Sequence, residues 1–566
     1  MTITNFFFFF TKHLNFKIWL KLFLSFFLNL IIIFSEIVFL SLFLSLLNRP
    51  VDSKIYNYFY NYLEYLLIYL DTDFSPNEIS IIFLIFFLIF KNILTLFNNA
   101  FVNSLIFGLS AEKSTQLLRN YMNKTYEIFS KKEISVYTKE IIRDVENVFT
   151  GILGLIILFV GELVYTIIIV YFVLNLVEIE LNLKFYILFS FIFISLYILL
   201  GLAQKAGNLR STNEIKIFKS LADILNIFKE IKLSYVLEDF LQRFNIFLKE
   251  YYKSRVYSYI INLTPKFFLE IFVVLFFFIL FTNDTSVKDF NEFIIKYSVL
   301  AIGFLRLIPS FSRLSSYSNT IFYNLDSIKF IKNDLDNLSY KKREFFSGYK
   351  LDSIKLKNVS LIYSKKDNSS RSLKNNFNYE FKKNNFYGIY GDSGSGKTTL
   401  LNTLIGFIKS KKGKIIYNGK VINPSQIIKK FKIGYAPQLP TILDENIEIN
   451  ATLKYKNNAK KVSKIKKLLT RFNLKKFTNK KYFKNLDKNI FLIKNISGGE
   501  KQRLSLIRSI INNPDLILLD EPTSALDRRN EVKVFKFLNS IKKNKIIIVS
   551  THKKQNQKFF DKIIKL

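Results

Sequence analysis

The sequence predicts a multidomain chain in which an all-α transmembrane domain of six helices precedes an α/β domain of the P-loop type. Three observations support this fold class. There are six apolar runs before residue 332, short β-branched strands alternate with helical segments after residue 350, and GDSGSGKTT occurs at Gly391–Thr399. We therefore expect a transmembrane domain at 1–332, a linker at 333–350 and a nucleotide-binding domain at 351–566.

Composition narrows the setting of this chain. With 566 residues, 50% of them hydrophobic and 17% aromatic, it is too long for one domain and too apolar for a purely soluble protein. The net charge of +38 is scattered along a chain rich in Phe, Ile, Lys and Asn, so we interpret it first as codon bias and expect no nucleic-acid partner. Cysteine is absent, which excludes disulfides, thiolate nucleophiles and Cys-based metal sites.

The apolar runs have the length of membrane spans, for which about 20 residues are needed. The expected spans are Ile18–Leu47, Ile79–Leu96, Phe149–Leu176, Leu183–Leu202, Pro265–Phe281 and Phe293–Leu314. Nothing before Ile18 resembles a cleavable signal peptide, because the apolar run is too long and no small-residue cleavage site follows it.

Cations are frequent after the second and fourth spans and scarce after the first, third and fifth. The positive-inside rule then places the two long loops, both termini and the nucleotide-binding domain in the cytoplasm. The protein is thus expected to be a multi-pass protein of the bacterial cytoplasmic (inner) membrane. Apolar residues at helical spacing in both loops predict helices that continue beyond the bilayer. The aromatic segment from Ile55 is either an interfacial helix or an ordinary structured loop.

The motif G-x-x-x-x-G-K-[ST] runs from Gly391 to Thr398, between an expected strand and an expected helix. This is the context of a phosphate-binding loop, since glycines let backbone N–H groups wrap phosphates, Lys397 reaches the β- and γ-oxygens, and Thr398 offers a hydroxyl to Mg²⁺. ATP and Mg²⁺ are the expected cofactors. The loop residues expected to bind ATP are Gly391, Asp392, Ser393, Gly394, Ser395, Gly396, Lys397, Thr398 and Thr399.

The segment DLILLDEPTSALD supplies an apolar strand that ends at Asp520 and is followed by Glu521. A buried strand that delivers a carboxylate to its end suits a Mg²⁺ ligand, and the next carboxylate is placed to polarise an attacking water. The alternative is a surface Asp-Glu pair after a core strand. It is disfavoured because the phosphate loop requires such a partner.

The stretch ISGGEKQR, Ile496–Arg503, resembles the signature of the ATP-binding cassette (ABC) family, and the similarity extends over Leu351–Leu566. It implies that Tyr363 stacks on adenine, that Gln438 links Mg²⁺ to the membrane domain, and that His552 contacts the γ-phosphate. Glu521 and His552 would be catalytic, and Thr398, Gln438 and Asp520 would hold Mg²⁺. The remaining family positions are the signature residues Ser497, Gly498, Gly499 and Glu500 and the D-loop residues Ser524, Ala525, Leu526 and Asp527.

In that family, six spans followed by one cassette imply an exporter-type half-transporter. The signature residues would contact the ATP held by a partner, so a homodimer with two composite ATP sites and alternating access is expected. The long loops around Glu127–Val148 and Leu221–Phe244 would dock on the cassettes. The segment Lys481–Asn495 departs from the family, because it lacks the Gly-Glu run usual in exporters.

Two further stretches, KEIKLSYVLEDFLQRF and RLIPSFSRLSSYSNTIFYNLDSI, resemble the lipid-linked oligosaccharide flippases of bacterial protein N-glycosylation. This implies a lipid-linked glycan, or another amphipathic anionic substrate, carried within membrane lipid. The alternatives are a general lipid exporter (lipid A-like), a multidrug exporter, and an ATP-gated channel or regulator.

Arg306 lies roughly 20 Å along its helix from Phe293, past the middle of the hydrocarbon core. Arg313 follows seven residues later on the same face. A charge at this depth is costly and is either functional or paired. Both arginines are expected to bind the pyrophosphate of the substrate by bidentate hydrogen bonds. The alternative is that Arg306 pairs with Glu270 or Glu162, or snorkels.

Overall fold

The structure, a computed structural model, describes residues 9–46, 76–176, 183–234, 236–283, 290–336, 348–364, 370–410, 412–455, 457–479, 482–483 and 496–566. The chain divides into two compact units. Met1–Asn123 and Lys132–Ser339 form a helical unit, and Lys124–Lys131 and Tyr340–Leu566 form an α/β unit.

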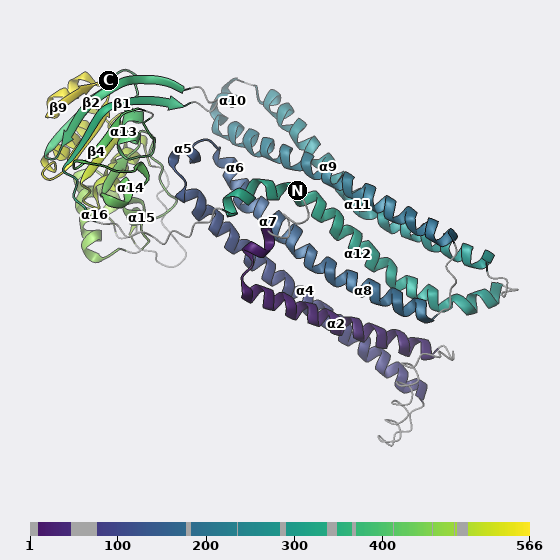
Figure 1. Ribbon diagram of the computed structural model, residues 1–566. Helices are drawn as coiled ribbons and strands as arrows, with labels where there is room; N and C mark the ends of the chain where they lie inside the picture. Colours follow the sequence, from purple (N-terminus) through teal and green to yellow (C-terminus); the bar gives the residue numbers. More distant parts are fainter. Residues whose placement is uncertain are drawn as a thin grey trace. The chain divides into compact units, whose positions relative to one another are not determined.

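The helical unit is built from long helices joined by short ones. They are α2 (Phe16–Leu46), α4 (Pro76–Asn123), α6 (Ile134–Lys139), α7 (Val145–Val148), α8 (Leu155–Leu176), α9 (Leu183–Asn226), α10 (Phe228–Ser234), α11 (Leu237–Asn283) and α12 (Phe290–Asp336). Two π-helical turns, η1 (Glu140–Asp144) and η2 (Phe149–Gly154), lie between α6 and α8. Helix α9 runs beside α11, and α2 runs beside α4 (Figure 1).

The expected loops continue as helix, and that prediction is confirmed. Helix α4 extends to Asn123, α9 extends to Asn226, and α11 begins at Leu237. Helix α12 extends to Asp336, into the segment expected as the linker. The aromatic segment from Ile55 lies outside the described residues.

Apolar side chains cover the outside of the helical unit as well as its core. Phe39, Ile169 and Phe272 are buried together between α2, α8 and α11, yet Phe23 on the outside of α2 is 67% exposed. A helix that is apolar all round fits a lipid environment. Four segments of the described chain are long and apolar enough to cross a membrane, namely Phe16–Phe43, Ser80–Asn123, Ile134–Phe172 and Leu237–Thr282.

Two of the expected spans, Leu183–Leu202 and Phe293–Leu314, lie in α9 and α12. Neither is among those four segments, and part of the side chains of each lies outside the described residues. The number of six spans therefore stays a prediction.

The α/β unit contains two sheets. Strands β2 (Ser370–Lys382), β1 (Ser353–Ser364), β4 (Lys414–Tyr417) and β5 (Lys420–Val421) form an antiparallel sheet in that order. Strands β6 (Ile433–Ala436), β7 (Leu516–Asp520), β8 (Ile546–Thr551), β3 (Asn385–Tyr390) and β9 (Lys562–Lys565) form a parallel sheet in that order.

Helices and turns connect these strands. They are α13 (Lys397–Leu404), α14 (Pro424–Lys430), α15 (Ile447–Thr452), α16 (Ala459–Arg471), η3 (Lys475–Thr478), α17 (Gly498–Ile510), α18 (Arg528–Ser540) and η5 (Lys554–Phe559). The short helix α5 (Tyr126–Phe129) also belongs to this unit, and its Tyr126 ring stacks on Phe407 with centroids 5.3 Å apart.

The parallel sheet is buried on both faces, which explains its continuous apolar strands. Ile517 and Leu519 of β7 pack into one core cluster, whereas Leu516 and Leu518 pack into the other. Successive side chains of a strand point to opposite faces, so a strand covered on both sides must be apolar throughout. This sheet fixes where the loops at its carboxyl edge lie.

Candidate functional site

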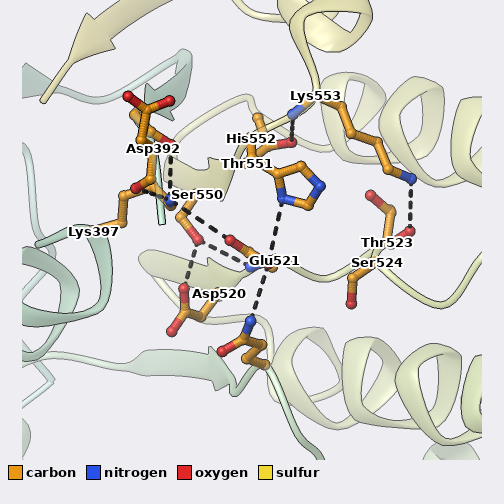
Figure 2. Close-up of polar contacts among 12 residues, drawn as sticks. Asp392, Lys397, Asp520, Glu521, Thr523, Ser524, Ser550, Thr551, His552 and Lys553 are labelled. Carbon is orange, nitrogen blue, oxygen red and sulfur yellow. Dashed lines mark hydrogen bonds and ion pairs between the residues drawn. The ribbon is translucent and has the colours of Figure 1, made fainter. Parts of the chain in front are cut away.

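The site lies at the carboxyl edge of the parallel sheet. Asp520, the last residue of β7, is in register with Ser550 of β8, and Tyr390, the last residue of β3, is in register with Thr551. The segments that follow β3, β7 and β8 therefore leave the sheet side by side. They carry the phosphate loop, Glu521 and His552, and Figure 2 shows these side chains converging.

The phosphate loop, Gly391–Gly396, turns directly from β3 into α13. Gly394 and Gly396 have φ of 83° and 100°, a region that favours glycine. A Cβ on Gly391 would lie 2.4 Å from Ser395 Oγ and 3.0 Å from the Leu566 carbonyl oxygen, so a side chain there would displace Ser395.

Lys397 is buried at the start of α13, and its Nζ donates to the carbonyl oxygens of Gly391 at 2.9 Å and Asp392 at 3.0 Å. Ser395 Oγ is buried without a hydrogen-bond partner in the described part of the chain. A buried cation whose hydrogen bonds go only to carbonyl oxygens, beside a hydroxyl without a hydrogen-bond partner, is a donor set that phosphate oxygens would complete. The loop therefore fits a nucleotide.

Thr398 and Asp520 meet where the sequence predicts the Mg²⁺ ligands. Thr398 Oγ1 donates to Asp520 Oδ2 at 2.6 Å, and Ser550 Oγ donates to Asp520 Oδ1 at 2.6 Å. Asp520 is almost fully buried, so these hydroxyls compensate its charge. A hydroxyl and a carboxylate in contact are oxygen ligands that Mg²⁺ accepts together with phosphate oxygens. The described residues contain no group of three or more acidic, His or Cys side chains that could hold a metal without such phosphate oxygens.

Glu521 stands at the centre of the site. Its Oε2 accepts a hydrogen bond from Gln438 Nε2 at 3.0 Å and lies 3.5 Å from His552 Nδ1, and its Oε1 lies 3.7 Å from Lys397 Nζ. Its φ of 44° is unusual for a residue with a side chain. The backbone N–H of Glu521 donates to Ser550 Oγ at 2.9 Å, which helps to hold that conformation.

The predicted signature residues begin helix α17. Ser497 caps this helix, accepting from the Glu500 N–H at 3.3 Å, while Glu500 accepts from the Ser497 N–H at 3.0 Å. Lys476 pairs with Glu500 at 2.6 Å. Burial alone would raise the pKa of Glu500, but the hydrogen bonds from Lys476 and Ser497 outweigh it and lower that pKa.

The D-loop, Ser524–Asp527, is tied to α17 of the same chain. Gln502 Nε2 donates to Ser524 Oγ at 2.6 Å, and the Ala525 N–H donates to Gln502 Oε1 at 2.9 Å. A Cβ on Gly499 would lie 2.9 Å from Ala525 O. Sequence reasoning missed Gln502, although its place two residues after Glu500 in GGEKQR was a usable signal.

A buried carboxylate, Glu531 of α18, joins the segments after β7 and β8. It accepts from Thr523 at 2.8 Å, from Lys553 at 3.2 Å and from Asn556 at 2.9 Å, and it pairs with Arg528 at 2.8 Å. Burial alone would raise the pKa of Glu531, but these hydrogen bonds lower it below its usual value. No sequence motif pointed to this residue.

Other predicted positions contribute backbone or lie outside the described side chains. Thr399 is buried in α13, whereas Asp392, Ser393 and Gly394 are exposed or half-exposed at the loop surface. Tyr363 is in β1, but its side chain is outside the described set, as is most of the atypical segment Lys481–Asn495.

In the helical unit, both arginines proposed to bind substrate are paired with carboxylates. Arg306 Nε lies 3.5 Å from Glu36 Oε1, and Arg313 donates to Glu162 Oε1 at 2.7 Å. The expected pairing of Arg306 with Glu270 or Glu162 is therefore wrong in its partners. Glu36 lies on α2, far from Arg306 in sequence, and no periodicity in the sequence links the two.

Comparison with known proteins gives a consistent result. Residues 374–524 match the ABC transporter family. The chain is 25% identical over 513 residues to an export ATP-binding/permease protein of Rickettsia typhi, covering 85% of this chain and 84% of that protein. It is also 33% identical over 215 residues to the lipoprotein-releasing system ATP-binding protein LolD of Buchnera aphidicola, covering 90% of that protein.

One solved structure, described as a bacterial Atm1-family ABC exporter with ATP bound, shares the fold with a TM-score of 0.70. The two chains are 15% identical, and the match covers 94% of this chain and 92% of the other. At that identity the likeness concerns the fold alone.

Proposed function

The chain belongs to the ABC transporter family, as an exporter-type half-transporter that couples ATP hydrolysis to transport. We propose that the substrate it flips is a polyprenyl-pyrophosphate-linked oligosaccharide. The substrate would move from the cytoplasmic to the outer leaflet by alternating access. Both termini and the α/β unit would lie in the cytoplasm. The observation that carries the choice of substrate is the pair Arg306 and Arg313 on α12, within the helical unit.

The chain's own residues have distinct roles in the hydrolytic step. Lys397 and the loop glycines bind the phosphates, and Thr398, Asp520 and Gln438 would hold Mg²⁺, which would neutralise phosphate charge. Glu521 orients the attacking water and accepts its proton. His552, whose Nδ1 already lies 3.5 Å from Glu521, orients that carboxylate and contacts the γ-phosphate.

A homodimer follows from the position of the signature. In the described residues, the side-chain contacts of Ser497 and Glu500 are with each other and with Lys476, and none is with the phosphate loop of the same chain. The exposed start of α17 presents N–H groups and the positive end of the helix dipole, which suit the γ-phosphate of a partner's ATP. Each ATP would then lie between two chains.

The substrate assignment rests on charge chemistry inside an apolar unit. Guanidinium groups bind phosphate oxygens in bidentate fashion, and a sugar-bearing pyrophosphate needs such groups while its polyprenyl tail stays in lipid. The two arginines retain exposed area, 32% for Arg306 and 47% for Arg313, despite their glutamate partners. They remain accessible in the single chain.

A flipping assay tests this proposal. The full-length protein in proteoliposomes should move a fluorescent polyprenyl-pyrophosphate oligosaccharide in an ATP-dependent manner, and Arg306→Ala and Arg313→Ala should each abolish this movement. Lys266→Ala is the matched control, because Lys266 is an exposed cation of the same unit paired only loosely with Glu270. ATP-dependent movement that survives both arginine substitutions would favour a general lipid or drug exporter.

A further inference from the structure

Glu36 is a fully buried carboxylate inside the helical unit. It lies on α2 with Lys91 of α4 on one side and Arg306 of α12 on the other. Neither of its oxygens accepts a hydrogen bond in the described part of the chain. Glu36 is therefore in direct contact with Lys91 and more loosely paired with Arg306, so its hold on the arginine is the weaker of the two.

Glu162 of α8 forms a second, tighter pair. Its Oε1 accepts from Arg313 at 2.7 Å and from Ser310 at 2.5 Å, and both donors are on α12. Arg306 and Arg313 are seven residues, close to two turns, apart on one face of α12, so the two pairs follow one another along that face. The two pairs thus form one polar cluster across α2, α4, α8 and α12, which are labelled in Figure 1.

The cluster is unevenly charged and unevenly covered. Among the described residues it contains three cations, Lys91, Arg306 and Arg313, and two anions. The arginine side chains are 32% and 47% exposed, whereas Glu36 is 0% and Glu162 16% exposed. The carboxylates therefore lie behind the arginines, and the open side of each arginine remains available to an approaching anion.

Arg306 makes its pair with Glu36 through Nε and lies over the Phe39 ring, with 4.8 Å between its Cζ and the ring centroid. A guanidinium has five N–H donors. In the described chain none of those of Arg306 is used in a hydrogen bond that meets ordinary geometry, so most of its donor capacity is free. A resident carboxylate and a substrate anion would compete for the same positive charge.

We propose that Glu36 and Glu162 are internal counter-anions that make the arginine site selective for headgroups carrying more than one negative charge. This rests on the proposed function. A monoanionic phosphodiester offers an arginine little more than the carboxylate that already neutralises it, so ordinary anionic bilayer lipids are rejected. A pyrophosphate carries more charge and several more acceptor oxygens, so it outcompetes the carboxylates. Selectivity of this kind works by opposing the wrong ligand.

The test measures ATPase stimulation of the full-length protein in phosphatidylcholine vesicles containing undecaprenyl pyrophosphate or phosphatidylglycerol. The wild type should respond to the pyrophosphate lipid and not to phosphatidylglycerol. In the double variant Glu36→Gln/Glu162→Gln, phosphatidylglycerol should also stimulate the ATPase. The concentration of pyrophosphate lipid that gives half-maximal stimulation should fall about three- to tenfold. The control variant Glu270→Gln, which removes the charge of an exposed carboxylate of the same unit, should show the same selectivity between the two lipids as the wild type.

Unchanged selectivity in the double variant, or a wild type stimulated equally by both lipids, overturns the inference. The wild-type comparison needs no variant and remains valid if the double variant fails to fold. Ser310→Ala, which removes one of the two donors to Glu162 but keeps its charge, leaves this carboxylate to pair more strongly with Arg313, so it should raise the concentration of pyrophosphate lipid needed for half-maximal stimulation, opposite to the double variant.

Two further outcomes separate this inference from the function on which it rests. If the pyrophosphate lipid fails to stimulate the wild type, the proposed substrate is wrong and the inference falls with it. If it stimulates the wild type and the double variant with the same half-saturating concentration, only the inference is wrong.

Inorganic pyrophosphate with excess Mg²⁺ distinguishes a lipid headgroup from a free anion. Competition without stimulation supports a headgroup site, and stimulation equal to that of the lipid contradicts it.

Discussion

Glu521 Oε2 accepts a hydrogen bond from Gln438 Nε2 at 3.0 Å, so the proposed general base is held by a residue that follows a different strand, β6. His552 and Lys397 lie 3.5 and 3.7 Å from the same carboxylate. Four segments at one edge of the parallel sheet thus converge on one side chain.

Replacing Glu521 by Gln should preserve ATP binding and lower turnover by about 10²- to 10⁴-fold, because the amide keeps the size of the side chain but cannot accept a proton. The variant should accumulate as an ATP-bound dimer. Phosphate release and nucleotide binding measured on the same preparation test this. Near-normal hydrolysis would remove Glu521 from the role of base.

Lys397→Ala should fail earlier, at nucleotide binding. Lys397 Nζ is buried, its hydrogen bonds go to carbonyl oxygens of its own loop, and Glu521 Oε1 lies 3.7 Å away, so its charge is held where phosphate would bind. Loss of a charge-assisted contact should weaken ATP binding at least about tenfold. Equilibrium binding of a fluorescent ATP analogue measures this, and Lys383→Ala, an exposed lysine of the same unit, is the control. Unchanged affinity in Lys397→Ala would contradict the phosphate-binding role.

Local sequence patterns predicted much of this site because its parts lie at the ends of regular elements. An apolar strand followed by GDSGSGK places the loop before α13, and a second apolar strand delivers Asp520 to the same edge. Because the carboxyl ends of parallel strands lie at the same edge of a sheet, no other sequence signal is needed to place these residues together. Such predictions need only the chain order and the rules of sheet packing.

The contacts that sequence reasoning missed join residues whose separation carries no periodic signal. Arg306 meets Glu36 rather than Glu270 or Glu162, because the tertiary arrangement of the helices brings the side chains of α2 residues Glu36 and Phe39 to this arginine. Gln502 reaches Ser524 only after α17 has packed beside the segment that follows β7. Pairings of this kind depend on tertiary packing, which composition and helical spacing do not contain.

Composite ATP sites can be tested by mixing two inactive chains. Glu521→Gln chains combined with Ser497→Arg chains should give heterodimers with one doubly disabled site and one sound site. ATPase activity should therefore reappear in the mixture, although each variant alone is inactive. Tagged chains purified in tandem provide the heterodimer for the assay. If activity stays at the level of the separate variants, the two sites are either not composite or strictly coupled.

Gln502→Ala should uncouple the D-loop from the signature helix. Gln502 makes two hydrogen bonds, to Ser524 Oγ at 2.6 Å and from the Ala525 N–H at 2.9 Å. Their loss should reduce ATPase about three- to tenfold while leaving ATP affinity of the monomer unchanged, since neither bond touches the phosphate loop. Lys501→Ala, at the exposed neighbouring position, is the matched control. Equal activity in both variants would show that this link has no role in hydrolysis.

Glu531 should make the stability of the protein depend on pH. Its hydrogen bonds favour the charged form and outweigh burial, so its pKa in the folded protein lies below the usual value of 4.5. A carboxylate with a lowered folded pKa binds fewer protons folded than unfolded, so its stabilisation is complete above the unfolded pKa and is lost as pH falls through the folded pKa. At pH 7 Glu531→Gln should lower the melting temperature by about 5 °C, because it breaks a buried charge-assisted network.

The melting difference between wild type and Glu531→Gln should then shrink as the pH falls below about 4.5. Thermal unfolding of the full-length protein in detergent between pH 3 and 7 measures this (about 0.5-unit steps suffice to follow a single titration). Glu448→Gln, an α15 position without a side-chain partner among the described contacts, should show no such trend. A difference that stays constant through the acidic range would mean that Glu531 is neutral in the folded protein, and that its neighbours stabilise it as an acid rather than as a carboxylate.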